Sequence, residues 1–146
     1  MTMNKIIEET TIDVCEPSDN AAVIYTTRQM SAQIGFNEAE QFLIAAAASE
    51  LSTNIIRYAK KGVVVLRFIK KIISEQESSI NITGIEITAK DSGCGISNVD
   101  QAMQEHFSTG NSLGLGLPSV KRIMDEFFIE SSPENGTVVI ATKWRE

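Results

Sequence analysis

The pattern of hydrophobic and polar positions predicts that the chain begins with a strand followed by a helix. Ile12 and Val14 alternate with polar neighbours, so residues 6–14 are expected to form the first strand. Apolar residues then recur at helical spacing after Pro17, which with the following Ser-Asp pair suits a helix start. Gly35 suits the residue that ends this helix.

A second helix has clear signals at its start. Asn37 is a good N-cap, and Glu40 stands three residues later, where a capping box places its acid. Strong helix formers follow early and basic residues come late, an order that suits the helix dipole. The helix is expected to end at Gly62.

The rest of the pattern predicts short strands and helices. In chain order these are a strand at 63–69, a polar connection at 70–79, a strand at 80–90, a loop at 91–95, a short helix at 98–105, a helix from Pro118 to about Glu126, and strands 127–131 and 137–144. Pro118 suits a first helical turn, and Asn135 with Gly136 marks a hairpin. This order predicts an α+β fold, a two-layer sandwich of a mixed, mostly antiparallel sheet with helices on one face.

Length, composition and charge narrow the class of protein. A chain of 146 residues with no repeat or low-complexity block is expected to form one domain, 1–146. Cys15 and Cys94 are expected to be reduced thiols in the cytoplasm, and no segment is apolar enough for a signal peptide or a membrane span. The net charge of -6 argues against nucleic acid as a partner, and the single His106 excludes two-histidine metal motifs.

Residues 108–122, STGNSLGLGLPSVKR, place glycines directly before a predicted helix. The chain has no Gly-Lys pair, so this is not a P-loop, and Ser119 stands where a dinucleotide fingerprint needs its third glycine. Glycines before a helix can still bring backbone N–H groups close to a phosphate. A phosphate cradle and a purely structural loop both remain open from this segment alone.

Three other segments carry candidate chemistry. Glu50 and Asn54 are four residues apart on one helix face, where they could hold a divalent cation and orient a hydroxyl, or form an ordinary solvated face. Asp91 could accept a hydrogen bond from a base amino group, or belong to a plain Asp-x-Gly turn. Thr137 begins the last strand, where its hydroxyl could serve a ligand or simply end a hairpin.

Taken in order, these segments resemble the GHKL ATPase superfamily of gyrase, heat-shock chaperones, histidine kinases and MutL. Glu50 and Asn54 resemble its N box, residues 91–95 its first glycine box and residues 114–117 its second. The resemblance implies the ATP-binding (Bergerat) fold. It is closest to the bacterial serine kinases of partner-switching modules. The motifs that carry this narrower match to the RsbT-type kinases of the stressosome are SELSTNIIRYA at 49–59, FSTG at 107–110, LGLGLPSVKRIMDEF at 113–127 and ATKW at 141–144.

The resemblance implies that ATP and Mg²⁺ are cofactors and assigns roles by position. Asn54 would ligate Mg²⁺, Glu50 would orient or deprotonate the attacking hydroxyl, and Asp91 would hold the adenine amino group. The other expected ATP-binding residues are Gly93 and Gly95 at the base pocket, Ser108, Thr109 and Gly110 in a lid, Gly114, Leu115, Gly116 and Leu117 at the phosphates, and Thr137 near the adenine.

The resemblance also implies partners and leaves an alternative. The kinase would phosphorylate a serine or threonine of a STAS-domain protein, an RsbS-like antagonist or RsbR-like scaffold, and then activate an RsbU-like phosphatase. The alternatives are an anti-sigma factor that sequesters a sigma subunit and phosphorylates its anti-anti-sigma factor, and a nucleotide-binding module without transfer activity, against which the intact Glu50 argues. Two features depart from the family pattern: Cys94 stands where proline is common, and residues 70–84 are expected to form a surface loop extension.

Overall fold

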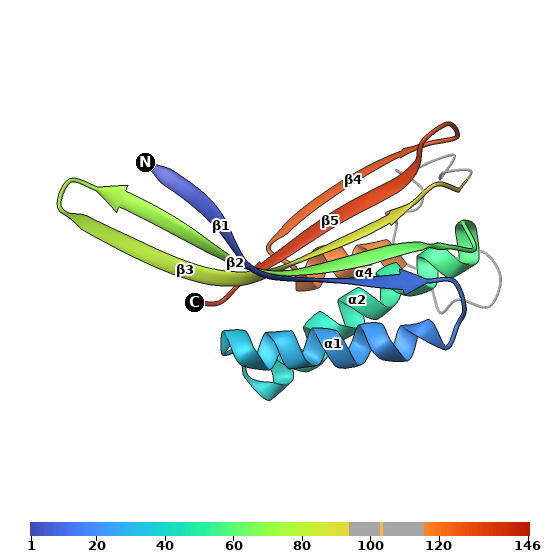
Figure 1. The fold of residues 1–146 in the computed structure, drawn as a ribbon, viewed down its shortest axis with the longest axis horizontal. Coiled ribbons are helices and arrows are strands. Elements are labelled where there is room, and N and C mark those ends of the chain that lie inside the picture. The colour runs from blue at the N-terminus through green and yellow to red at the C-terminus, as the bar shows by residue number, and fades with distance from the viewer. Residues whose placement is uncertain (94–102, 104–115) are drawn as a thin grey trace.

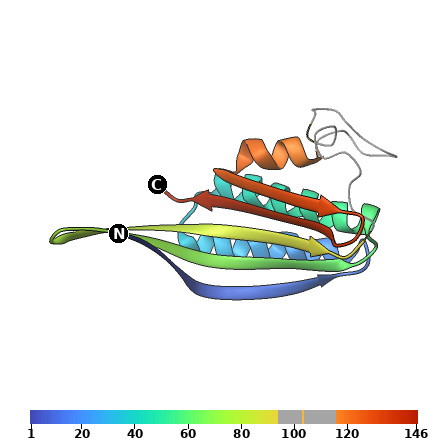
Figure 2. The same cartoon turned by 90° about the horizontal axis from the view of Figure 1, so that it is seen from above.

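The computed structural model describes residues 1–93, 103 and 116–146. Five strands form one sheet in the order β1-β2-β3-β5-β4. Every neighbouring pair is antiparallel, so the described sheet is antiparallel throughout rather than mixed. The helices lie on one face of it (Figures 1 and 2), which confirms the expected two-layer α+β fold. The elements are β1 (Thr2–Val14), α1 (Asp19–Ile34), α2 (Glu38–Tyr58), β2 (Gly62–Glu75), β3 (Ser78–Asp91), α4 (Gly116–Ile123), β4 (Glu126–Ser132) and β5 (Gly136–Trp144).

Helix α1 has the boundaries that the sequence predicts. Gly35 ends it in the left-handed conformation, with φ at 113°, and its amide donates to the carbonyls of Ser31 and Ala32. At the other end, the Asp19 carboxylate accepts hydrogen bonds from the amides of Cys15 (2.8 Å) and Glu16 (3.0 Å). These bonds, that of Cys15 first, favour the ionised form and hold the pKa of Asp19 below its ordinary value.

The Asp19 contacts predict how stability depends on pH. Because the folded-state pKa is lowered, the carboxylate stabilises the fold fully above its ordinary pKa of 3.8, and this contribution disappears as the pH falls through the folded-state value. We therefore expect Asp19→Asn to lower the melting temperature at pH 7 and to make a smaller difference at about pH 2.5. Melting curves across this range test it. Asp13→Asn, which changes an exposed aspartate of β1, is the control, and an equal gap at both pH values would contradict the prediction.

Helix α2 begins as predicted and ends earlier than predicted. The Asn37 side chain accepts from the amide of Glu40 (2.8 Å), and the Glu40 carboxylate accepts from the amide of Asn37 (3.1 Å), which confirms the capping box. The last helical residue is Tyr58, not a residue next to Gly62. Lys60 takes the left-handed conformation, with φ at 72°, and turns the chain into β2.

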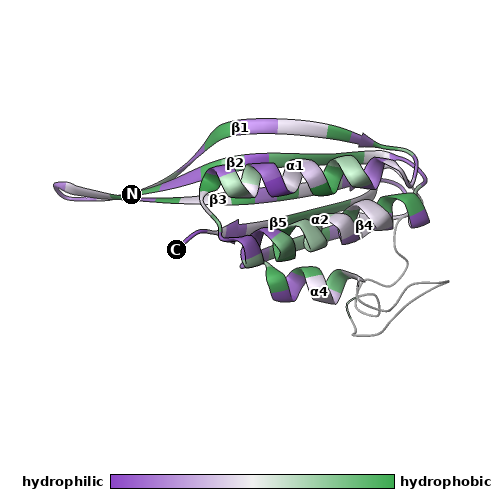
Figure 3. Ribbon diagram, turned by 90° about the horizontal axis from the view of Figure 1, so that it is seen from below, coloured by the Kyte–Doolittle hydropathy of each residue, from purple (hydrophilic) through white to green (hydrophobic). Residues whose placement is uncertain are grey.

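The core lies between the sheet and its helical layer. Ile44, Leu51 and Ile55 of α2 are fully or almost fully buried, and they belong to one cluster with Leu66 of β2 and Ile87 of β3. Figure 3 shows hydrophobic stretches on the helices and on the strands that run beneath them. This packing fixes the C-terminal half of α2 against the strands that will carry the candidate site.

Strands β2 and β3 continue well beyond the helical layer, and here the sequence prediction was wrong. Residues 70–79 were expected to be a polar connection and 70–84 a loop extension, but β2 runs to Glu75 and β3 starts at Ser78. Only Gln76 and Glu77 form the turn. The first strand is also longer than expected, because Thr2–Lys5 pair with β2 as well. We call this three-stranded projection, residues 2–6, 69–75 and 78–84, the arm (Figure 1).

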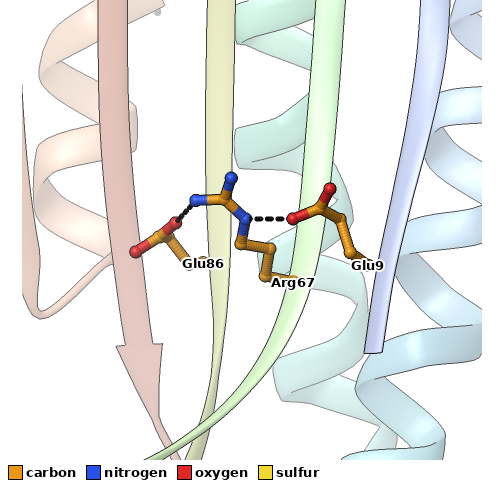
Figure 4. Close-up of polar contacts among 3 residues, drawn as sticks. All are labelled: Glu9, Arg67 and Glu86. Atoms are coloured by element: carbon orange, nitrogen blue, oxygen red, sulfur yellow. Dashed lines mark hydrogen bonds and ion pairs between the residues drawn. The ribbon is translucent and has the colours of Figure 1, made fainter. Parts of the chain in front are cut away.

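An ion-pair ladder crosses the outer face of the sheet. The Arg67 guanidinium on β2 contacts Glu9 of β1 at 2.6 Å and Glu86 of β3 at 3.0 Å (Figure 4). These hydrogen bonds, to Glu9 and then Glu86, raise the pKa of Arg67 further above its ordinary value. The three residues are partly exposed, so the ladder helps to hold the register of neighbouring strands more than it adds stability.

The C-terminal part follows the predicted order with shifted bounds. Helix α4 was expected to reach about Glu126, but it ends at Ile123, because Glu126 already pairs with Thr142 as the first residue of β4. The predicted hairpin at Asn135-Gly136 is confirmed. The predicted helix at 98–105 lies outside the described residues, apart from Met103 in a turn. None of the described helices is both long and apolar enough to cross a membrane.

Candidate functional site

A pocket lies between the C-terminal half of α2 and the ends of β3 and β5, beside the start of α4. Its lining consists of Leu51, Asn54, Ile55, Tyr58, Ala89, Asp91, Leu117, Thr137 and Val139. Mostly apolar walls with a few polar groups are typical of small-molecule sites. Four residues that the sequence singled out meet here: Asn54, Asp91, Leu117 and Thr137.

Asp91 is held in place by two backbone amides. It is the last residue of β3, and its Oδ1 atom accepts hydrogen bonds from the amides of Gly93 (3.0 Å) and Thr137 (3.3 Å). Among the described residues, Oδ2 takes part in no hydrogen bond. The carboxylate therefore has one oxygen that fixes its orientation and a second that can accept a hydrogen bond from a ligand.

Three glycines near Asp91 let backbone segments pack closely around it. A Cβ added to Gly62 would lie 3.0 Å from the Asp91 Cβ and 2.5 Å from the Lys90 carbonyl oxygen. One added to Gly93 would lie 2.6 Å from the Cβ of Ala59, at the end of α2. One added to Gly136, whose φ is +77°, would lie 2.2 Å from the Asp91 carbonyl oxygen. Sequence reasoning expected Gly93 at the pocket but took Gly136 only as a turn residue and Gly62 only as a helix stop.

We expect Gly136→Ala to lower both stability and nucleotide affinity. The left-handed backbone costs an alanine about 1 kcal/mol, and the overlap with the Asp91 carbonyl forces the β5 start and Asp91 apart, so we expect a total loss of about 1–3 kcal/mol. Chemical denaturation and nucleotide titration measure the two effects. For stability, Gly116→Ala is the control, since no atom of the described residues lies within 4 Å of its added Cβ. Equal stability of the two variants would contradict the prediction.

The backbone amide and the side-chain hydroxyl of Thr137 bond to different partners. The amide donates to Asp91, whereas the hydroxyl lies 2.7 Å from the Ser131 hydroxyl on β4. These two residues face each other in the β4–β5 ladder. The sequence prediction placed the Thr137 hydroxyl near the adenine, and the structure adds a positioning contact through its amide.

Asn54 and Glu50 occupy successive turns of α2. Asn54 lines the pocket, so its carboxamide is available to a ligand there. Glu50 is half-buried, stands one turn (about 6 Å along the axis) toward the helix start, and is not among the pocket-lining residues. The arrangement suits two different tasks, with Asn54 at the pocket wall and Glu50 beyond it.

Magnesium binds oxygen ligands and usually keeps several waters and phosphate oxygens around it. The Asn54 carboxamide oxygen is a hard donor of this kind at the pocket wall. The residues that the structure describes hold no cluster of three His, Cys, Asp or Glu side chains. Asn54 could therefore hold a magnesium ion at this wall of the pocket.

The start of α4 reaches the pocket through Leu117. Gly116 opens this helix, and no atom of the described residues lies within 4 Å of a Cβ added to it. Helix N-termini offer unpaired N–H groups and a partial positive charge. The basic residues Lys121 and Arg122 lie elsewhere, at a shallow depression with Met103 and Pro118.

Several predicted site residues lie outside the described part of the chain. These are Gly95 of the first glycine box, Ser108, Thr109 and Gly110 of the expected lid, and Gly114 and Leu115 of the second glycine box. Their roles remain predictions from the sequence.

Comparisons with known proteins identify the family to which this chain belongs. Residues 39–146 match the family of histidine kinase-, DNA gyrase B- and HSP90-like ATPases. Over 117 residues the chain is 39% identical to the serine/threonine-protein kinase RsbT of Bacillus subtilis, and this alignment covers 80% of the chain and 82% of RsbT. It is 33% identical over 104 residues to the anti-sigma F factor of a Thermoanaerobacter species, covering 69% and 68% of the two chains. The chain therefore belongs to the histidine kinase-, DNA gyrase B- and HSP90-like ATPase family, as its ordered motifs and its two-layer fold predicted.

Proposed function

We propose that residues 1–146 form one domain that acts as a Mg·ATP-dependent protein serine/threonine kinase in a bacterial partner-switching module for stress signalling. The similarity to RsbT confirms the enzyme class, and the anti-sigma F relatives support partner switching. The observation that carries the proposal is the pocket itself, where Asp91, oriented by two amides, shares the wall with Asn54.

The base of ATP would lie at the Asp91 end of this pocket. Asp91 Oδ2 would accept a hydrogen bond from the adenine amino group, because Oδ1 is already occupied by two amides. Apolar side chains, including Ile55, Ala89 and Val139, would flank the flat base. This recognition depends on the close glycine packing that keeps Asp91 in position.

The phosphates would extend toward Asn54 and the start of α4. Backbone N–H groups at Gly116 and Leu117 would donate to phosphate oxygens. Asn54 would hold the magnesium ion through its carboxamide oxygen. Magnesium, when bound, neutralises charge on the phosphates during transfer.

Glu50 would act on the protein substrate. Its carboxylate would orient the attacking serine or threonine hydroxyl and accept its proton as the oxygen bonds to the γ-phosphorus. The bond from the γ-phosphorus to the β–γ bridging oxygen would break, so ADP leaves with that oxygen. A position just outside the pocket lining suits a residue that meets a hydroxyl arriving from another protein.

The substrate would be a STAS-domain protein, an RsbS-like antagonist or an RsbR-like scaffold. Released from it after phosphorylation, the kinase would activate an RsbU-like phosphatase. Incubation with Mg·ATP and each STAS protein, followed by phosphosite mapping, tests the first step, and we expect one modified serine or threonine. A phosphatase assay with and without the kinase tests the second. Nucleotide binding without any phosphate transfer would contradict the proposal.

The anti-sigma F relatives support a second candidate, an anti-sigma factor that retains kinase activity toward an anti-anti-sigma factor. Both candidates use the same pocket, so a nucleotide assay does not separate them. A pull-down from cell extract does: sigma subunit in the eluate favours the anti-sigma factor, whereas STAS scaffold and phosphatase favour the switch kinase.

A further inference from the structure

The first half of helix α2 exposes large hydrophobic side chains in a stretch without charge. Phe42 is 65% exposed and Leu43 is 47% exposed. Between Glu40 and Glu50 the helix carries no charged residue. The outward face of a surface helix normally carries charged and polar residues. A contiguous apolar area on such a face marks a place of contact with another molecule.

Leu43 and Glu50 lie on the same side of α2. They are seven residues apart, which is about two helical turns, so their side chains project in nearly the same direction about 10 Å apart along the axis. Asn54 follows one turn later on this side, at the wall of the nucleotide pocket. A line along the helix therefore leads from exposed apolar surface through Glu50 to the pocket.

Helix α1 adds an aromatic side chain to this surface. The two helices form an antiparallel pair in the helical layer (Figures 1 and 3), and the Asn20 Nδ2 atom of α1 donates to the Ser49 hydroxyl of α2 at 3.0 Å. Tyr25 comes five residues after Asn20, so it is level with the part of α2 that follows Phe42. Its side chain is 63% exposed. We call this surface the apolar patch; its members are Tyr25, Phe42, Leu43 and the half-buried Ala46.

A protein whose hydroxyl reaches Glu50 must also cover the apolar patch. A specific protein–protein contact buries about 800 Å² of each partner, which corresponds to an area about 30 Å across. The patch begins about 10 Å from Glu50, so it falls inside a contact that is centred there. Beyond Glu50 in the other direction, the outward side of α2 carries Thr53 and Arg57, which are polar. The hydrophobic part of such a contact is therefore on the patch side of Glu50.

We propose that the apolar patch is the docking surface for the protein substrate of this kinase, an inference that rests on the proposed function, in which Glu50 meets the substrate hydroxyl. The acceptor serine or threonine lies at Glu50, and a hydrophobic surface of the substrate, about 10 Å from that hydroxyl, packs on Phe42 and Leu43. Aromatic side chains that become buried in a contact commonly carry much of its binding energy, so Phe42 is the main anchor.

Other exposed hydrophobic side chains are in the wrong place for this role. Within the part of the chain that the structure describes, and apart from residues 1–7 and Ile80, the one further example is Phe128 of β4. Its neighbours Phe127 and Ile129 pack against the core, so Phe128 points to the outer face of the sheet. A protein bound on that face cannot present a hydroxyl to Glu50, because the sheet lies between them.

Steady-state phosphorylation of the STAS protein at saturating Mg·ATP tests the proposal. We expect Phe42→Ala to raise the KM for the STAS protein about 10- to 100-fold, the range expected for loss of an aromatic anchor, and to change kcat little, because Glu50 and the pocket are intact. Alanine is the best helix former and the Phe42 side chain is exposed, so the melting temperature and the Kd for Mg·ATP should match the wild type. Phe128→Ala is the matched control: it removes an exposed phenylalanine from the other face and should keep the wild-type KM.

Photo-crosslinking identifies the molecule that covers the patch. The photoreactive amino acid p-benzoylphenylalanine at position 42 should crosslink to the STAS protein, and the same amino acid at position 128 should not. If the wild type transfers phosphate but Phe42→Ala keeps its KM, or if position 42 crosslinks only to a second copy of the kinase, the docking surface is wrong and the proposed function stands. If the wild type transfers no phosphate to any STAS protein, the proposed function fails, and this inference fails with it.

Discussion

The Glu50→Gln variant should transfer phosphate to its protein substrate about 10²- to 10⁴-fold more slowly than the wild type. Glutamine keeps the shape of the side chain and its ability to accept a hydrogen bond, but it takes up no proton from the attacking hydroxyl. Because Glu50 is outside the pocket lining, the Kd for Mg·ATP should change little. Single-turnover transfer to a STAS protein and a separate nucleotide titration measure the two quantities.

A carboxylate on the same helix provides the control for this experiment. Glu38, in the first turn of α2, is exposed and three turns away, so Glu38→Gln should transfer phosphate at the wild-type rate. Melting curves of both variants show whether either substitution disturbs the helix. If Glu50→Gln keeps more than a tenth of the wild-type rate, the role of Glu50 as the base is wrong.

Asp91→Asn should weaken ATP binding about 10- to 100-fold, the loss expected when a hydrogen bond to a charged group is removed. The asparagine carbonyl oxygen can still accept from the amides of Gly93 and Thr137, so the loop should keep its position. The amide nitrogen then takes the place of Oδ2 and points a donor at the adenine amino group, which is also a donor.

Because asparagine presents a donor where aspartate presents an acceptor, the Asp91 prediction tests recognition of the base specifically. Inosine triphosphate carries a carbonyl oxygen where ATP carries the amino group, so Asp91→Asn should lose much less affinity for it than for ATP. Asp91→Ala should lose affinity for both nucleotides, since it also releases the two backbone amides. An ATP affinity unchanged in Asp91→Asn would show that Asp91 does not contact the base.

Local signals in the sequence were sufficient for most elements. The capping pair Asn37 and Glu40, the helix-ending Gly35 and the Asn-Gly hairpin act through bonds between residues near in the chain, and all are confirmed. The helices and the alternating strands themselves follow from the spacing of hydrophobic side chains along the chain. The ordered N box and glycine boxes identified the family for the same reason, because each motif is short and contiguous.

The strands of the arm were not predicted, because alternation of hydrophobic and polar residues reveals a strand only where one of its faces is buried. Residues 70–79 extend past the helices and none of them is fully buried, so the alternation that marks a half-buried strand is lost. What makes this segment a strand is pairing with β1 and β3, which no local pattern records.

The sequence by itself determined the family, the order of the elements and the identity of Asn54, Asp91, Leu117 and Thr137 as candidate site residues. Only the tertiary structure decided how Asp91 is held. Gly62 and Gly136 are distant from Asp91 in the chain, yet each must lack a side chain for backbones to meet there. Such a requirement arises from contacts formed on folding, so it leaves no trace in the spacing of neighbouring residues.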